Sequence, residues 1–372
     1  AQMRFSAQSI RIAQYRPYSK EYVYYSSEYN DRLGRLPSMF PTPIHSNIGF
    51  SIAGPYPNVA GSLLATTLLP DLNVFTASQY FPRFTWAAVS AYDGGLFGEG
   101  DVVKQLREGP VMVLTGAGVS TESGVPDYRG PRGSLSRHRP MTYQEFRHDP
   151  AASHRYWARS FVGWRVMDSA VPNRTHYALV ELERAGLVNG VVTQNVDGLH
   201  KQAGTANLVA LHGDMETVVC LMCGHREARP HFDARLAAAN PGYLERLVVE
   251  ADQVNPDGDV TLDESDVAAF RMAGCERCGS ELLKPDVVYF GEPVPAERRD
   301  AAFAVLGQAR SLLVAGSSLA VMSGYRFVLE AKKQGKRVAV INGGPGRADD
   351  RVDVLWRTDL ATAFRRIMPQ LV

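Results

Sequence analysis

The chain has 372 residues, of which 45% are hydrophobic and 21% are charged, and its formal net charge is +1 at pH 7. This length is enough for two or more globular domains. A chain so close to neutrality is not expected to bind nucleic acid or a membrane surface through bulk charge. No run of about 18 apolar residues occurs, so the sequence predicts no transmembrane helix.

Residues 1–98 differ in composition from the rest of the chain. They are rich in Tyr, Phe, Ser and Pro, and Asp71 is the only Asp, Glu, Lys or Arg between Arg35 and Arg83. Tyr22–Tyr29 has the pattern of an edge strand, but periodicity is otherwise weak and this N-terminal extension has no assigned role. A loosely docked or disordered extension, and upstream sequence wrongly joined to the gene, both fit this composition. The acid-free first residues faintly resemble a mitochondrial presequence. The predicted location is the cytoplasm, and the likeness to a presequence makes the mitochondrial matrix the alternative.

Beyond Asp101 the sequence alternates between apolar strands and helical stretches. Each predicted strand ends in small or amide residues, a pattern typical of a Rossmann-like, doubly wound parallel sheet in an α/β fold. Ligands of such sheets bind at the carboxyl ends of the strands. The predicted strands are Val111–Thr115, Val191–Thr193, Ser311–Ala315 and Arg337–Ile341, and the predicted helices include Asp149–Trp164 and Ala296–Arg310.

These elements predict a division of the chain into four parts. The Rossmann-like domain is expected to consist of three segments, and a small helical and zinc-binding domain is expected to be inserted between them. The expected limits are 1–98 for the extension, 99–148, 176–215 and 284–372 for the Rossmann-like domain, 149–175 for the helical insertion and 216–283 for the zinc-binding insertion.

A glycine-rich segment follows the first predicted strand. Gly116 and Gly118 permit a tight turn close to a pyrophosphate, and the hydroxyls of Ser120 and Thr121 can donate hydrogen bonds to one. A strand-to-loop turn with structural glycines is the alternative, because a Gly-Ala-Gly sequence alone is a weak signal. The charged and aromatic continuation 126–129 favours a binding site, since a simple turn does not need it.

A polar cluster and a histidine follow the second predicted strand. Asn195 and Asp197 lie two residues apart at a strand end, so they can face the same cleft. His212 follows another apolar strand end, and a neutral imidazole there can act as a general base near pH 7. A buried structural histidine is the commoner role, and His176 is expected to hydrogen-bond within a helix.

All four cysteines of the chain occur in two C-x-x-C pairs. Two close pairs offer four thiolates to one tetrahedral metal ion, so we expect one structural Zn²⁺. Vicinal disulfides and a thioredoxin-like redox motif are the alternatives. The expected ligands are Cys220, Cys223, Cys275 and Cys278.

Seven motifs occur in residues 101–372: GAGVSTESGVPDYRG, TQNVDGLH, LHGD, the two C-x-x-C pairs, KPDVVYFGE, GSSLAV and the INGG strand end. Their order resembles that of sirtuins, the NAD-dependent protein-lysine deacylases. The resemblance is closest to class II sirtuins, the group that contains the mitochondrial fourth human sirtuin and bacterial relatives, because it extends to RYWARSFVGW (Arg155–Trp164), NPDGDV (Asn255–Val260) and SGYRF (Ser323–Phe327).

The resemblance implies roles for individual residues. His212 would be the general base, and Asn195 would also serve catalysis. NAD, as co-substrate, would be bound by Gly116, Ala117, Gly118, Ser120, Thr121, Asp127, Tyr128, Arg129, Gln194, Asn195, Asp197, Gly316, Ser317, Ser318, Asn342, Gly343 and Leu360. An acylated lysine of a protein would bind as an added strand between Phe290, Gly291 and Glu292 on one side and Leu319, Ala320 and Val321 on the other.

The resemblance also implies the reaction. The acyl-lysine carbonyl oxygen attacks the ribose carbon that bears nicotinamide, which gives an alkylimidate and releases nicotinamide. His212 then deprotonates a ribose hydroxyl, which attacks the imidate carbon, and hydrolysis yields free lysine and O-acyl-ADP-ribose. Protein mono-ADP-ribosylation and lipoamidase activity are the alternatives within class II, and a non-catalytic NAD-sensing scaffold is the alternative of another kind. The acyl preference stays open, with Arg137 or Arg139 as candidates for favouring acidic or bulky acyl groups.

Overall fold

The computed structural model describes residues 97–130, 133, 139–247, 255 and 258–372. The chain divides into two compact units, Ala1–Phe97 and Gly98–Val372. This division falls close to the change of composition noted near residue 98. The edge strand expected at Tyr22–Tyr29 lies outside the described residues.

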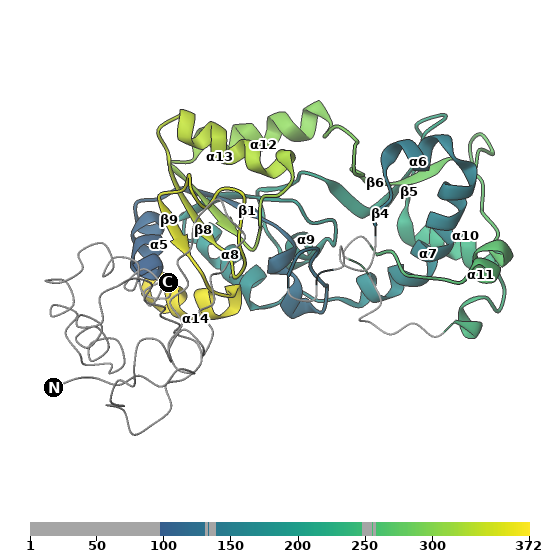
Figure 1. The fold of residues 1–372 in the computed structure, drawn as a ribbon, viewed down its shortest axis with the longest axis horizontal. Coiled ribbons are helices and arrows are strands. Elements are labelled where there is room, and N and C mark those ends of the chain that lie inside the picture. Colours follow the sequence, from purple (N-terminus) through teal and green to yellow (C-terminus); the bar gives the residue numbers. More distant parts are fainter. Residues whose placement is uncertain (1–96, 131–132, 134–138, 248–254, 256–257) are drawn as a thin grey trace, which may run out of the picture. The chain divides into compact units, whose positions relative to one another are not determined.

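The core of the second unit is a parallel sheet whose strands run in the order β3-β2-β1-β7-β8-β9 (Figure 1). Three of the four predicted strands have the predicted limits, and the fourth, β2, begins three residues earlier. The sheet also contains β3 and β9, whose lengths of three residues give no clear sequence pattern. The strands are β1 Val111–Thr115, β2 Val188–Thr193, β3 Leu208–Ala210, β7 Ser311–Ala315, β8 Arg337–Ile341 and β9 Val354–Trp356.

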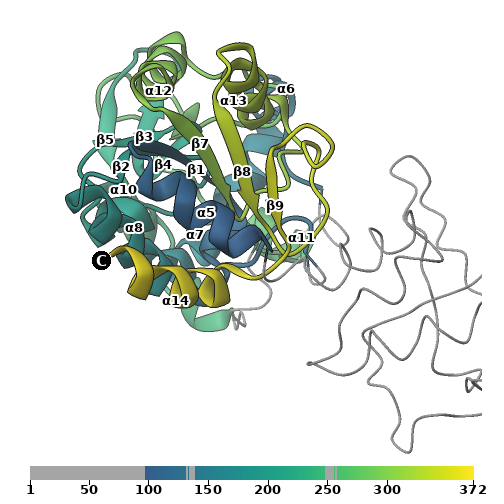
Figure 2. The ribbon, with the colours of Figure 1, turned by 90° about the vertical axis from the view of Figure 1, so that its left-hand side faces the viewer.

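Helices cover both faces of this sheet (Figure 2). Val111 and Val113 pack in one apolar cluster with helices α5, α8 and α14, whereas Met112 and Leu114 pack in another with α12 and α13. Burial on both sides explains why β1 reads as an unbroken apolar run. The helices are α5 Phe97–Arg107, α8 Arg174–Arg184, α9 Leu199–Ala203, α12 Ala296–Gln308, α13 Met322–Lys333 and α14 Leu360–Leu371, with short 3₁₀ turns η2 Ala117–Val119 and η3 Thr121–Ser123 after β1.

A second, antiparallel sheet of order β5-β4-β6 lies beside a group of helices. Its strands and helices share one apolar cluster, which contains Trp157 and Phe161 of α7 and also Cys220 and Cys275. The elements are α6 Tyr143–His148, α7 Pro150–Ser169, β4 Gly213–Cys220, β5 Arg226–Ala228, α10 Arg229–Ala239, η5 Leu244–Arg246, α11 Glu264–Ala269 and β6 Leu283–Val287.

Local capping fixes where the helices of this region begin. The Asp149 side chain accepts a hydrogen bond from the Ala151 amide at the start of α7, with Pro150 in the first turn, an arrangement that satisfies an otherwise unpaired helix amide. The helix extends to Ser169, five residues beyond the predicted end. Phe146 of α6 is buried in the same cluster as α7. The predicted domain limits within the second unit stay predictions.

Candidate active site and metal centre

A cavity of about 830 Å³ opens at the carboxyl ends of β1 and β7. From these two neighbouring strands the strand order runs outward in opposite directions across the sheet. Strands β1 and β7 are neighbours here, and the chain leaves them on opposite sides, with β2 next to β1 and β8 next to β7. The residues after Thr115 and Ala315 therefore form the rim of a crevice, which is the usual ligand site of an open α/β sheet. The volume lies within the usual range for small-molecule and cofactor sites.

The two loops that leave β1 and β7 are in close contact. The Gly118 amide donates to the Gly316 carbonyl oxygen at 2.9 Å, and a Cβ added at Gly118 would lie 2.9 Å from the Gly316 Cα. Gly316 itself has a φ of +66°, a backbone conformation that favours glycine. The contact between the two loops therefore requires glycine at both positions, whether or not a ligand also approaches this backbone closely.

Most of the predicted cofactor and substrate residues line this one cavity. From the cofactor set, the lining contains Gly116, Ala117, Gly118, Asp127, Tyr128, Arg129, Gln194, Asn195, Asp197, Gly316, Ser317, Ser318 and Asn342. From the other sets, it contains His212, Phe290, Gly291, Glu292, Leu319, Ala320 and Val321. The predicted residues that do not line it are Ser120, Thr121, Gly343 and Leu360.

Ser120 is not among the residues that line the cavity, and its predicted contact with the cofactor stays a prediction. Its side chain is completely buried. Its hydroxyl donates to Asp197 Oδ2 at 2.7 Å and accepts from Asn195 Nδ2 at 3.0 Å. The Thr121 hydroxyl likewise has a protein partner, because it donates to the Gly118 carbonyl at 3.1 Å. Ser120 therefore positions Asn195 and Asp197, the residues that face the cavity.

Replacing Ser120 with alanine should weaken the site without unfolding the chain. The substitution removes a hydrogen bond to the charged Asp197 carboxylate, and such bonds contribute about 1.5–3 kcal/mol. We expect kcat/KM for NAD to fall by about 10- to 150-fold, since about 1.4 kcal/mol corresponds to tenfold. Steady-state kinetics with varied NAD would measure this loss. Ser169→Ala, at an exposed hydroxyl that bonds to Val166 within α7, is the matched control, and equal kinetics for the two variants would refute the role of Ser120.

His212 lies between two hydrogen-bond partners on the cavity wall. Its Nδ1 lies 2.8 Å from the Gln194 carbonyl oxygen, and its Nε2 lies 2.8 Å from Ser323 Oγ. A carbonyl oxygen can only accept, so Nδ1 carries the proton and Nε2 carries a lone pair. Burial lowers the pKa of His212, and the nearby Arg298 lowers it further, whereas the bond to Gln194 raises it. The net shift is downward, so the ring is neutral and basic at Nε2 near pH 7.

Two further buried histidines lie behind the cavity, and sequence reasoning gave one of them no role. His200 Nε2 lies 3.0 Å from Thr115 Oγ1, and its ring packs edge-on against the ring of His176 with centroids 4.7 Å apart. The His176 Nδ1 accepts from the Asn173 amide at the start of α8, which confirms the expected bond within that helix. Burial lowers the pKa of His176 to about 4 and that of His200 to about 3, so both rings are neutral supports.

Two segments that line the cavity, 127–129 and 290–292, contact each other. Phe290 and Tyr128 meet edge to face, with ring centroids 6.3 Å apart. The Glu292 carboxylate accepts from the Tyr289 amide and from Lys284 Nζ, which fixes the 290–292 segment. Arg139 pairs with Glu145 at 3.0 Å and does not line the cavity. Its proposed role in acyl recognition thus has no support from the geometry, and Arg137 lies outside the described residues.

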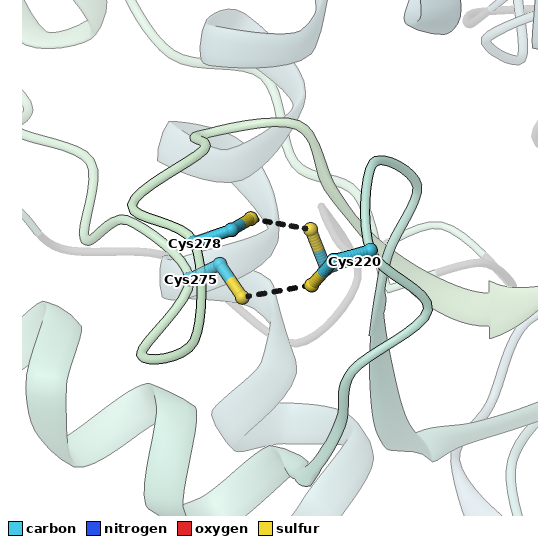
Figure 3. A group of neighbouring side chains, drawn as sticks. Cys220, Cys275 and Cys278 are labelled. Atoms are coloured by element: carbon cyan, nitrogen blue, oxygen red, sulfur yellow. Dashed lines mark hydrogen bonds between the residues drawn. The ribbon is translucent and has the colours of Figure 1, made fainter.

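The four cysteines form a single cluster in the small sheet region (Figure 3). Their sulfur atoms all lie within 4.8 Å of one another, with 3.6 Å from Cys220 to Cys278 and 3.7 Å from Cys223 to Cys275. All four cysteines are free in this structure, so neither C-x-x-C pair forms a disulfide in it. Four sulfurs bound tetrahedrally to Zn²⁺ at about 2.3 Å would lie about 3.8 Å apart, so the cluster fits zinc.

Matching turns hold the two cysteine pairs. The Gly224 amide donates to the Cys220 carbonyl at 2.9 Å, and the Gly279 amide donates to the Cys275 carbonyl at 2.8 Å. The first pair follows β4, and the second precedes β6, which is hydrogen-bonded to β4. Four thiolates complete a tetrahedral shell and leave no position for water, so the ion that they fit is structural.

Comparison with known proteins identifies the family. The model of the Sir2 family matches residues 116–323, more than half of the chain. The chain belongs to the Sir2 family. This sirtuin is 68% identical over 270 residues to "NAD-dependent protein deacetylase 1" of Corynebacterium efficiens, and the alignment covers 73% of this chain and 96% of that protein. It is 44% identical over 252 residues to "NAD-dependent protein deacylase Sirt4" of Drosophila melanogaster, covering 67% and 79% respectively.

Solved sirtuin structures share the fold of this chain. A Sir2 complex with a deacetylated p53 peptide and 3'-O-acetyl ADP-ribose superposes with a TM-score of 0.59 at 27% identity, covering 74% of this sirtuin and 98% of that chain. A Sir2 complex with a p53 peptide and NAD⁺ gives a TM-score of 0.58 at 28% identity, covering 73% and 97%. These matches confirm the Rossmann-like fold class predicted from the sequence.

The N-terminal part of this sirtuin resembles a different family. Residues 1–104 match a model described as the Type ISP C-terminal specificity domain. Almost all of this match lies outside the described residues. Within the described part of the chain, no helix is both long and apolar enough to cross a membrane.

Proposed function

We propose that this sirtuin is an NAD-dependent protein-lysine deacylase in which His212 is the general base. The observation that carries this proposal is the protonation state of His212 on the cavity wall. Its Nδ1 carries the proton that it donates to the Gln194 carbonyl oxygen, and its Nε2 holds a lone pair. A histidine must be neutral at the operating pH to accept a proton as a base. The relatives named as NAD-dependent protein deacetylases and deacylases support the same reaction.

In this proposal, NAD occupies the crevice between the β1 and β7 loops. The Gly116–Gly118 segment and Gly316–Ser318 would enclose the pyrophosphate and adenosine half, with Asn342 at the end of β8 beside them. Asn195 and Asp197, held by Ser120, would face the ribose and nicotinamide. NAD supplies a ribose carbon from which nicotinamide departs when the acyl oxygen attacks. The chain's own contribution is to orient this ribose toward His212 and to enclose it.

The acylated substrate would bind across the mouth of the cavity as an added strand. Residues 290–292 and 319–321 line the same cavity as His212, so an extended peptide between them would bring a lysine side chain toward His212. Main-chain bonds in this mode give affinity without reading side chains. The Sir2 structures solved with a p53 peptide and with a propionylated peptide support a peptide as the substrate.

Lysines with acyl groups other than acetyl should be included among the substrates tested, because one relative is named a lipoamidase. The protein named "NAD-dependent protein lipoamidase sirtuin-4, mitochondrial" of Bos taurus is 44% identical over 243 residues, which covers 64% of this chain.

The predicted location of this chain stays the cytoplasm, with the mitochondrial matrix as the alternative.

A panel of peptides tests the proposed function. Purified protein would be mixed with NAD and with acetyl-, succinyl-, longer-chain and lipoyl-lysine peptides of one sequence, and products would be identified by mass spectrometry. We expect loss of an acyl group from at least one peptide. Transfer of ADP-ribose to protein without loss of an acyl group would support mono-ADP-ribosylation instead. Tight NAD binding with no consumption would support the non-catalytic scaffold.

The acidic limb of the pH profile should lie below the ordinary histidine pKa of 6.5. Burial and Arg298 lower the pKa of His212, so the neutral base persists as the pH falls through 6.5 and is lost only at lower pH. His176 and His200 do not change charge in this range, because their pKa values are about 4 and 3. The measurement is kcat/KM against pH with an acyl peptide free of other titrating groups. A half-loss of kcat/KM above pH 6.5 would contradict the assignment.

A further inference from the structure

Ser323 closes the side of His212 that must receive a proton. Its Oγ lies 2.8 Å from Nε2, while Nδ1 is committed to the Gln194 carbonyl. A neutral imidazole has one donor and one acceptor nitrogen, so the Ser323 hydroxyl donates to Nε2. Both nitrogens of the ring are thus occupied by protein partners, and the only lone pair points at Ser323.

The position of Ser323 is fixed by the same strand ends that form the cavity. Ser323 is the second residue of α13 and lines the cavity together with His212. The adjacent Gly324 packs on the Gln194 side chain so closely that a Cβ there would lie 2.5 Å from Gln194 Oε1. The Gln194 amide in turn donates to Ser317 Oγ at 2.8 Å. The start of α13, and with it the Ser323 hydroxyl, is therefore held against the carbonyl that orients His212.

Resting on the proposed function, we propose that Ser323 relays the proton from the ribose hydroxyl to His212. The ribose O–H bond breaks and its proton forms a bond to Ser323 Oγ, while the Ser323 Oγ–H proton passes to His212 Nε2. The electron pair left on the ribose oxygen then attacks the substrate carbon. Ser323 ends the step neutral, and His212 ends it with one more proton.

The chemistry of a hydroxyl suits this relay. A serine hydroxyl has one donor and two acceptor positions, so it can receive a proton from the cavity side while it gives one to Nε2. Once Nε2 is protonated, Ser323 Oγ can accept a hydrogen bond from it. Such a charge-assisted bond is roughly twice as strong as a neutral one. It would stabilise an imidazolium that burial disfavours.

Two partial reactions separate a relay from a merely structural serine. Nicotinamide departs before His212 acts, so exchange of labelled nicotinamide into NAD, in the presence of an acetyl-lysine peptide, reports on the earlier step alone. For Ser323→Ala we expect exchange within about threefold of the wild type and deacylation slower by about 10- to 100-fold. Ser323→Thr keeps the hydroxyl and should restore deacylation to within about threefold.

A spectroscopic measurement supplies evidence independent of turnover. In protein with ¹⁵N-labelled histidine, with the His212 signals assigned by their loss in His212→Ala, the Nε2 resonance should be that of an unprotonated, hydrogen-bonded nitrogen. Ser323→Ala should move it toward the position of a nitrogen without a donor, and Ser169→Ala should leave it unchanged.

Three results would overturn the relay: deacylation by Ser323→Ala within about twofold of the wild type, a parallel fall of exchange and deacylation, or failure of Ser323→Thr to restore the rate. An unmoved Nε2 resonance in Ser323→Ala would equally refute the contact. Absence of peptide-dependent nicotinamide exchange in the wild-type protein would instead overturn the proposed function.

Discussion

Replacing His212 with alanine should lower kcat for deacylation by about 10²- to 10⁴-fold, the usual contribution of a positioned general base. The chain should still fold and bind NAD, because the hydrogen bonds of His212 are to Gln194 and Ser323 and not to the loops that would enclose the pyrophosphate. Nicotinamide exchange should be far less affected, since it precedes the proton transfer. Single-turnover kinetics and calorimetric titration with NAD would measure the two effects.

A matched control for this variant is available on the surface. His148 is exposed at the end of α6, so His148→Ala should leave deacylation within about twofold of the wild type. A His212→Ala variant that deacylates at the rate of His148→Ala would remove His212 from the mechanism. Loss of NAD binding together with turnover would show that His212 serves the fold or the cofactor rather than the proton transfer.

The second large effect is expected at the cysteine cluster. Cys278 is exposed, unlike Cys220 and Cys275, so Cys278→Ala removes a zinc ligand with little loss of apolar packing. The free energy of binding structural zinc, on the order of 10 kcal/mol, is folding free energy. We expect bound zinc to fall from about one ion per chain to near zero. The β4–β5–β6 region should become open to proteolysis, and deacylation should be lost because His212 directly precedes β4.

Met222 provides the control for this experiment. It lies between Cys220 and Cys223 and is 65% exposed, so Met222→Ala changes the same loop without removing a ligand. Metal analysis and limited proteolysis of the two variants would be compared. Full zinc content and protection in Cys278→Ala would contradict a four-thiolate structural site. Chelation of the wild-type protein should reproduce the variant, and added Zn²⁺ should reverse it.

The parts of the fold with a local signal could be predicted from the sequence. Strand β1 is buried on both faces, so its first four residues are all apolar, and its limits were predicted without error. The cysteine pairs reveal a zinc site because each C-x-x-C turn brings its two sulfurs together regardless of the rest of the fold. Strands β3 and β9 were missed because each is an edge strand of only three residues, which is too short to show periodicity.

The roles that depend on distant contacts could not be predicted in the same way. The Ser120 hydroxyl meets Asp197, 77 residues further along the chain, and Ser323 meets His212 across 111 residues. Nothing in either sequence neighbourhood shows which way a hydroxyl points. The motif therefore indicated Ser120 as a cofactor contact, which stays a prediction, but did not indicate its hydrogen bonds to Asn195 and Asp197. Ser323 carried no chemical signal of its own in the sequence.

The most direct test of the central claim is a product balance with wild-type protein, NAD and one acyl-lysine peptide that it deacylates. A base at His212 that acts on the ribose after nicotinamide leaves requires equal amounts of nicotinamide, freed lysine peptide and O-acyl-ADP-ribose. Mass spectrometry with a quantified internal standard for each product would measure them. Equal amounts support an NAD-dependent deacylase. Nicotinamide release that exceeds peptide deacylation, or that continues without any acyl peptide, would contradict it.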